Sequence, residues 1–177
     1  MKTNSTQLLT RSSFFLVMLI ISAKISIPIG MIPITLQTFS IFICAYLLTP
    51  KHSMLTISVY LLMGLIGLPV FASGGGIGYI MQPSFGFLLS FVIVTPCLSA
   101  LYHKTDKLSL QILLSFIALF FIYLIGSTYM YLLLNYLMLV EKSVSAVLSL
   151  AVFPFIINDS ISLIAALFIS KRLIKSL

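Results

Sequence analysis

The sequence predicts an all-α polytopic membrane protein that forms a single integral membrane domain over residues 1–177. Two observations carry this prediction. Hydrophobic residues make up 60% of the chain and charged residues only 7%, whereas a soluble globular domain carries roughly 25% charged residues. The few charges also gather in short segments between apolar runs, and a membrane-spanning helix needs about 20 mostly apolar residues.

The spacing of charges and turn residues predicts six transmembrane helices. The first five lie at about residues 12–27, 32–49, 53–68, 85–102 and within 108–140. The sixth lies within the last apolar stretch, 143–170, which Pro154 and Asp159 interrupt.

Six spans place both termini on the same side of the membrane. That side collects eight basic residues and the other side keeps two, namely Lys2, Arg11, Lys51, Lys104, Lys107, Lys171, Arg172 and Lys175 against Lys24 and Lys142. Because cytoplasmic segments carry the excess of Lys and Arg, we expect a multi-pass protein of the cell membrane with cytoplasmic termini. An alternative is a signal peptide ending near Ile21-Ser22-Ala23, whose removal leaves five spans.

The composition and the missing motifs exclude several function classes. The net charge is +7, but no short window is rich in basic residues, so we expect no nucleic-acid partner. Cys44 and Cys97 belong to no CxxC pair or metal-ligand cluster and are interpreted as packing residues. The motifs GxxxxGK[ST], HExxH and GxSxG are absent. The sequence therefore predicts no enzyme, no metal site and no cofactor.

Asp159 is the one carboxylate within an apolar stretch, where an ionisable group is costly and functional by default. Pro154 ends the preceding helix, and Asn158 and Asp159 are good N-cap residues for a last span over 161–177. Residues 143–153 then form a short helix in the outer leaflet. Asp159 is expected near the outer mouth, either as a helix cap alone or as a cap that also contacts a ligand.

The predicted outer loop 69–84 reads PVFASGGGIGYIMQPS, and its glycines exclude a stable helix. Non-helical backbone in a membrane is tolerated where it lines a cavity or is covered by protein. This loop is therefore either a surface connector or a site-lining segment, with Tyr79, Gln82 and Ser84 as its polar groups.

The predicted outer loop 25–38 reads ISIPIGMIPITLQT. Its polar residues Thr35, Gln37 and Thr38 follow the helix breakers, and such residues often bond to backbone within membrane helices. Lys24 precedes the loop and has three possible roles: it snorkels to the interface, pairs with Asp159 or attracts an anionic ligand.

The segments ISIPIGMIPITLQTF, YLLMGLIGLPVFASGGGIGYIMQPSFGF and PFIINDSISL resemble, in order and spacing, the signature segments of the BioY family. Members of this family are the biotin-capturing S components of energy-coupling factor (ECF) transporters. The resemblance covers residues 23–167, and GLPVFA at 67–72 is its most specific piece. It implies an S-component fold and an extracellular biotin pocket that the loop between the first two helices closes. It also implies a transmembrane T component and two ATPases as partners.

The last segment departs from the family pattern, which resembles PFxPGDxxK. Asp159 is kept, Asn158 replaces Gly, and Ser162 stands where Lys is expected. Position 162 lies beside Asp159 on the same helix face, so the carboxylate loses a cationic partner. Either Lys24 supplies the charge, or Asp159 is partly protonated, or the ligand differs.

The resulting hypothesis is a capture subunit in the lipid bilayer that binds biotin outside and delivers it inward with an ATP-driven module. The expected ligand-binding residues are Tyr79 and the glycine run with Gly75 and Gly76 around the rings, Asp159, Asn158 and Ser162 at the polar groups, and Gln37 and Gln82 as second candidates. Two alternatives remain open. One is a carrier of a related acid or vitamin such as lipoate, and the other is a structural membrane subunit that binds no ligand.

Overall fold

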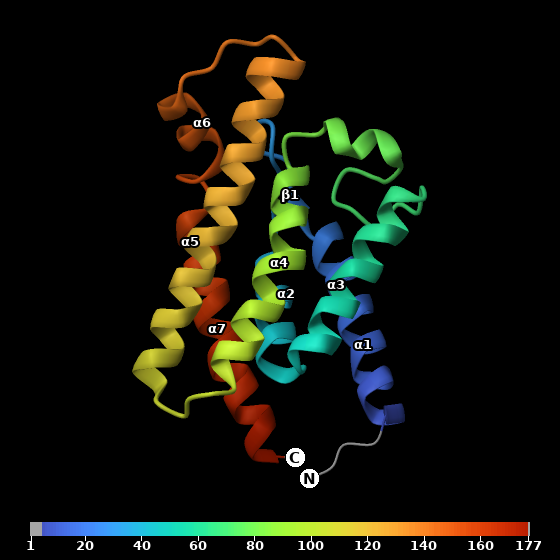
Figure 1. Ribbon diagram of the computed structural model, residues 1–177, viewed down its shortest axis with the longest axis vertical. Coiled ribbons are helices and arrows are strands. Elements are labelled where there is room, and N and C mark those ends of the chain that lie inside the picture. The colour runs from blue at the N-terminus through green and yellow to red at the C-terminus, as the bar shows by residue number, and fades with distance from the viewer. Residues whose placement is uncertain (1–4, 177) are drawn as a thin grey trace.

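The computed structural model describes residues 5–176 and shows a bundle of helices (Figure 1). The α-helices of this part of the chain are α1 (Ser5–Lys24), α2 (Gln37–Leu47), α3 (Pro50–Leu65), α4 (Phe85–Tyr102), α5 (Leu108–Leu132), α6 (Val144–Ala151) and α7 (Ile156–Ser176). A short antiparallel hairpin pairs β1 (Ser26–Ile27) with β2 (Ile34–Thr35). A 3-10 helix, η1 (Ile77–Met81), and a π-helical turn, η2 (Leu133–Leu137), complete the elements. The predicted all-α class is confirmed.

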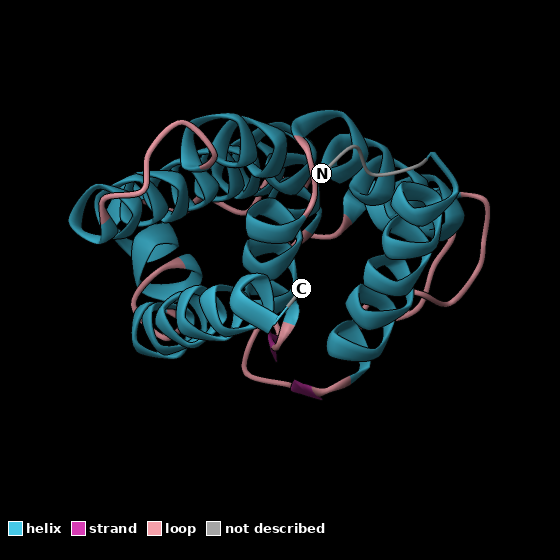
Figure 2. Ribbon diagram, turned by 90° about the horizontal axis from the view of Figure 1, so that it is seen from below, coloured by secondary structure: helices cyan, strands magenta, loops and turns pink. Residues whose placement is uncertain are grey.

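Six helices, α1 to α5 and α7, run alternately up and down the long axis, so both chain ends lie at one end of the bundle (Figure 1). The end-on view shows these helices side by side, with the two short strands on one side (Figure 2). Within residues 5–176, α1, α4 and α5 are long and apolar enough to cross a membrane, and the pair α6 and α7, bent by 47°, is so as well when the two helices are counted as one span. The chain is a multi-pass membrane protein.

Helices α2 and α3 are shorter than the spans predicted for them. They contain 11 and 16 residues, which corresponds to about 17 and 24 Å of helix at 1.5 Å per residue. The predicted spans 32–49 and 53–68 therefore include residues that lie in the β2 hairpin strand and in loops. By contrast, α4 covers the predicted range 85–102.

The predicted helix cap at Asn158 and Asp159 is wrong. Helix α7 begins at Ile156, and the amide of Asp159 already donates a helical hydrogen bond to the carbonyl of Phe155 at 2.8 Å. The physical reason is that Pro154 interrupts the helical conformation only locally, because proline ends one helix but is compatible with the start of the next one. Asp159 lies in the first turn of α7, where the helix dipole favours an acidic side chain.

Helix α2 is the most enclosed helix of the bundle and packs against α4 and α7. Nine of its 11 residues are buried. The hydroxyls of Tyr46 and Ser115 lie 2.7 Å apart and tie α2 to α5, and Ser99 of α4 donates to the carbonyl of Leu48 at 2.7 Å. These contacts hold the last turn of α2, and its first residues, Gln37 and Thr38, lie in the half of the bundle away from the termini.

Candidate functional site

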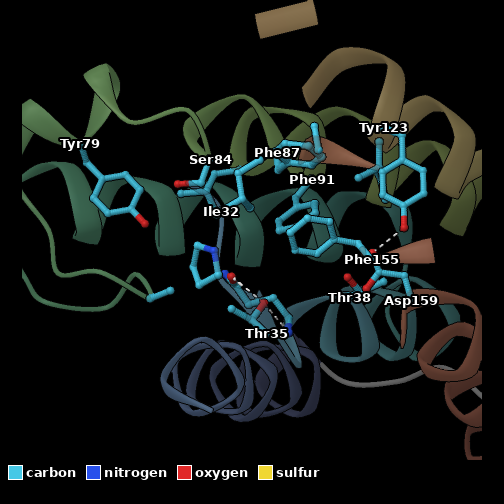
Figure 3. Close-up of a pocket in the computed structure, with 16 residues that line it drawn as sticks. Ile32, Thr35, Thr38, Tyr79, Ser84, Phe87, Phe91, Tyr123, Phe155 and Asp159 are labelled. Carbon is cyan, nitrogen blue, oxygen red and sulfur yellow. Dashed lines mark hydrogen bonds between the residues drawn. The ribbon is translucent and has the colours of Figure 1, made fainter. Parts of the chain in front are cut away.

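A cavity lies in the half of the bundle away from the chain ends, where α2, α4, α5 and α7 meet two loops (Figure 3). Its volume is about 60 Å³, enough for only a few water molecules. Most of its lining is apolar, and the lining residues are Ile32, Pro33, Thr35, Gln37, Thr38, Ala72, Tyr79, Ser84, Phe87, Leu88, Phe91, Ile122, Tyr123, Ala151, Phe155 and Asp159. A mostly apolar cavity with a few polar groups is typical of a small-molecule site.

Asp159 supplies the one carboxylate of this cavity, and only 6% of the residue is exposed. The hydroxyl of Tyr123 donates to its Oδ2 at 2.7 Å, and Nδ2 of Asn158 donates to its Oδ1 at 3.3 Å. The Thr38 hydroxyl is a further hydrogen-bonding partner, and Figure 3 shows it beside the carboxylate. A buried charge must be paired or hydrogen-bonded, and here the partners are neutral groups from α2, α5 and α7.

Lys24 does not reach the carboxylate. Its ammonium donates to the carbonyl of Phe71 at 2.7 Å, so the predicted possibility of a Lys24–Asp159 pair is wrong. The reason is positional: Lys24 ends α1, next to the loop that carries Phe71, and α1 packs mainly on α2 and α3. Lys24 therefore joins α1 to this loop.

Gln37 holds the wall of the cavity on the α2 side. Its Nε2 donates to the hydroxyl of Tyr60 at 2.8 Å, and its Oε1 accepts from the hydroxyl of Thr35 at 3.1 Å. The Tyr60 hydroxyl in turn donates to the carbonyl of Val70 at 3.2 Å. Both ends of the Gln37 carboxamide thus have protein partners, and this network fixes α2 against α3 and the loop after it.

Aromatic rings form the rest of the wall. Tyr79 is buried, packs on Phe71 with ring centroids 4.5 Å apart and ring planes tilted by 51°, and points its hydroxyl toward the cavity (Figure 3). On the facing sides stand Phe87 and Phe91 of α4 and Phe155, which precedes α7. Rings on several sides of one narrow space suit a flat or ring-shaped ligand.

The glycine run shapes a turn and does not line the cavity. Gly74 and Gly76 have φ angles of +119° and +110°, a backbone region that glycine adopts without strain. A Cβ on Gly75 would lie 2.1 Å from the carbonyl oxygen of Leu68. The Gly76 amide donates to the Gly64 carbonyl at 2.7 Å. This turn places η1 and its Tyr79 against the cavity.

The eight predicted ligand-binding residues therefore fall into three groups. Asp159, Gln37 and Tyr79 line the cavity. Asn158 and Ser162 lie beside Asp159 on α7, and Asn158 also reaches the Thr35 carbonyl at 3.5 Å. Gln82 is exposed and lines a separate cleft with the loop 28–33, and Gly75 and Gly76 line neither this cleft nor the cavity.

The structure adds lining residues that the sequence interpretation did not single out. Tyr123 is the most informative, because it is a hydroxyl-bearing residue near the middle of the longest apolar run. That position could have indicated a buried contact of the Tyr123 hydroxyl, since polar groups in a membrane span usually have a hydrogen-bonding partner. Phe87, Phe91 and Phe155 carried no such signal, because aromatic residues occur throughout the spans.

Comparisons with known proteins show the family of this chain. The profile of the BioY family matches residues 1–177. The chain belongs to the BioY family. A probable biotin transporter BioY from Lysinibacillus sphaericus is 31% identical over 177 residues, covering 99% of this chain and 90% of the relative. The biotin transporter BioY from Thermotoga maritima is 32% identical over 168 residues, with 94% and 95% coverage. The family resemblance noted in the sequence is thus confirmed.

A solved structure supports the same fold. The crystal structure at 2.1 Å described as the S-component for biotin from an ECF-type ABC transporter is similar to this BioY chain with a TM-score of 0.83. The match covers 98% of this chain and 95% of the solved chain at 24% identity. The predicted S-component fold is therefore confirmed.

Proposed function

We propose that this BioY chain is the membrane-embedded capture subunit of a biotin uptake system. The observation that carries the proposal is a narrow, aromatic-walled cavity with one buried carboxylate in a member of this family. Biotin pairs an apolar ring system with a polar cyclic urea, which fits a mostly apolar site with few polar groups. The names of the relatives, which describe biotin transporters, support the same ligand.

The proposed ligand contacts come from opposite sides of the cavity. Asp159 accepts N–H groups of the ureido ring, because an ionised carboxylate is an acceptor with several lone pairs. Asn158 and Ser162 extend this polar side along α7. Tyr79 and the phenylalanine rings of α4 flank the apolar part of the ligand.

The remaining predicted residues take other proposed roles. Gln37 keeps the start of α2 in place through its bonds to Thr35 and Tyr60. Gln82 meets the ligand on the way in, in the separate cleft that it lines. Gly75 and Gly76 serve the site indirectly, since their turn positions Tyr79.

Entry of biotin requires the walls to move, because a cavity of about 60 Å³ holds only a few water molecules. Ile32 and Pro33 line the cavity from the loop between β1 and β2, and Pro28, Gly30 and Met31 of the same loop line the separate cleft. We propose that this loop moves aside for the ligand and closes over it.

The proposed orientation has the cavity facing outward and both termini in the cytoplasm. The cavity lies in the half of the bundle opposite the chain ends (Figure 1). At the end that carries the termini, Lys51 lies in the first turn of α3, and Lys104 and Lys107 lie in the loop between α4 and α5. Basic residues mark the cytoplasmic side.

The proposed partners are a transmembrane T component and two ATPases. The chain has no phosphate-loop motif, so ATP-driven release inward needs other subunits. The solved protein with the same fold is described as an S-component from an ECF-type ABC transporter, which supports this assembly.

Equilibrium binding of labelled biotin to the purified chain in detergent tests the proposal. Saturable binding that cold biotin displaces, and that lipoate and thiamine do not, is the expected result. Displacement by lipoate at equal concentration assigns the site to a different acid, an outcome motivated by Ser162. Absence of binding at micromolar biotin, together with no thermal stabilisation by any of the three compounds, contradicts a capture function, since a ligand of the native state must stabilise it.

A further inference from the structure

The carboxylate of Asp159 is held by neutral groups alone. Tyr123 donates to Oδ2 at 2.7 Å and Asn158 donates to Oδ1 at 3.3 Å. No Lys, Arg or His lines the cavity in the part of the chain that the structure describes. Because a buried carboxylate without donors is strongly disfavoured, these hydrogen bonds fix both the position and the rotation of the group.

Thr38 of α2 is a third partner of Asp159. Between the bonds from Tyr123 and Asn158, the one from Tyr123 is the shorter and the more restrictive. Asn158 is the neighbour of Asp159 on the same helix, whereas Tyr123 belongs to α5, 36 residues away. Its ring is 8% exposed and lies between the cavity and an apolar groove that Phe116, Phe120 and Ile156 line on the other side. The ring therefore separates the cavity from this groove, and its hydrogen bond to Oδ2 sets the direction of its hydroxyl.

We propose that Tyr123 is the positioning residue of the ligand site. Its hydroxyl donates a hydrogen bond to Oδ2 of Asp159 and thereby orients the remaining lone pairs of the carboxylate toward the cavity. A carboxylate offers about four lone-pair positions. Tyr123, Asn158 and Thr38 use three of them, so acceptor capacity is left for a ligand. With no cation at the cavity, the head group that fits is a neutral one with N–H donors, such as a cyclic urea. The choice of ligand rests on the proposed function, whereas the Tyr123–Asp159 bond does not.

Tyr123→Phe tests this inference because it removes the hydroxyl and keeps the ring. Hydrogen bonds to charged groups are worth enough that we expect the Kd for biotin to rise about ten- to a hundredfold. Tyr131→Phe is the matched control, because Tyr131 is a partly exposed tyrosine of the same helix that does not line the cavity. Its Kd is expected to stay within about twofold of the unchanged chain.

Infrared spectroscopy of the purified chain detects the carboxylate of Asp159 directly, so it distinguishes a lost hydrogen bond from a general loss of packing. The chain has only three acidic side chains, so the difference between the unchanged chain and Asp159→Asn isolates the carboxylate band of Asp159. Tyr123→Phe is expected to shift that band, since a hydrogen bond from a hydroxyl polarises the carboxylate. Tyr131→Phe is expected to leave it in place.

The two measurements separate the possible failures. If the unchanged chain binds no biotin, the proposed function fails while the infrared result still decides the Tyr123–Asp159 bond. If the chain binds biotin and Tyr123→Phe binds it within twofold, the positioning role is overturned. An unshifted Asp159 band in Tyr123→Phe overturns the bond itself.

Discussion

At the scale of single residues, the polar side chains around the cavity are hydrogen-bonded to one another. Gln37 is bonded at both ends of its carboxamide, and Tyr60 both accepts and donates a hydrogen bond. Asp159 has neutral donors on both oxygens. Because an unpaired polar group in surroundings without water costs several kcal/mol, a ligand with N–H donors would be stabilised by the acceptor capacity that Asp159 leaves open.

Asp159→Asn is expected to weaken biotin binding by at least about tenfold, because an amide replaces a charged acceptor at the proposed ureido contact. The measurement is the Kd from equilibrium binding. Asp106→Asn is the matched control, since Asp106 is an exposed loop residue outside the cavity. Equal Kd values for the two variants argue against Asp159 as a ligand contact.

Gly75→Ala is expected to destabilise the fold by about 1–3 kcal/mol, because the added Cβ meets the rigid carbonyl of Leu68 at 2.1 Å. Thermal unfolding in detergent without ligand is the measurement. Gly78→Ala is the control in the same loop, where a Cβ has no neighbour within 4 Å. A Gly75→Ala chain as stable as Gly78→Ala contradicts a structural role for the glycine turn.

At the scale of elements, the site depends on segments that interrupt the helices. The β1–β2 hairpin brings Ile32, Pro33 and Thr35 to the cavity, and the turn after α3 brings Tyr79. The break before α7 places Phe155 and Asp159 there as well. Irregular backbone in a membrane protein is tolerated where it is covered or lines a cavity, and these segments do the latter.

The register of the hairpin can be tested by cross-linking Ser26→Cys with Thr35→Cys in a Cys44→Ala/Cys97→Ala background. Ser26 and Thr35 are direct partners in the antiparallel ladder, where Cα atoms lie about 4.5–5.5 Å apart. That separation is within the range of a disulfide. We expect efficient oxidation, detected as a cross-link between the two cysteines after cleavage in the intervening loop.

The control pair is Ile29→Cys with Thr35→Cys, because Ile29 lies in the loop outside the ladder. Equal cross-linking of both pairs indicates a loop without a fixed register and contradicts the hairpin.

At the scale of the whole molecule, the alternating directions of α1 to α5 and α7 put the chain ends at one end of the bundle, and the cavity lies in the other half (Figure 1). This separation suits a capture subunit, because ligand contact and energy coupling can take place on opposite sides of the bilayer. Lys51, Lys104 and Lys107 lie at the end with the termini, in agreement with the proposed orientation.

The orientation predicts which engineered cysteines react in intact cells. In a Cys44→Ala/Cys97→Ala background, Met31→Cys is expected to react with a membrane-impermeant maleimide, because Met31 is 43% exposed in the loop above the cavity. Asp106→Cys, in the loop between α4 and α5, is expected to react only after permeabilisation. The reverse pattern places the termini outside.

The sequence by itself determined the class of this protein and much of its layout. Low charge and long apolar runs define a helical membrane protein, and the limits of α4 and the short helix before Pro154 followed from composition and helix breakers. The family was evident from local segments such as residues 67–72, since these keep their residues in order along the chain. Asp159 was also identified from the sequence, because a carboxylate in an apolar stretch is conspicuous by itself.

Only the tertiary structure decided which groups share the cavity. The contact between Tyr123 and Asp159 joins residues 36 positions apart, and the Gln37–Tyr60 bond joins residues 23 apart. No local pattern encodes such pairs, because helix packing sets which faces meet. The same holds for Lys24, which bonds to Phe71 and not to Asp159. It holds also for Gly75 and Gly76, whose turn is set by how the loop packs on the end of α3.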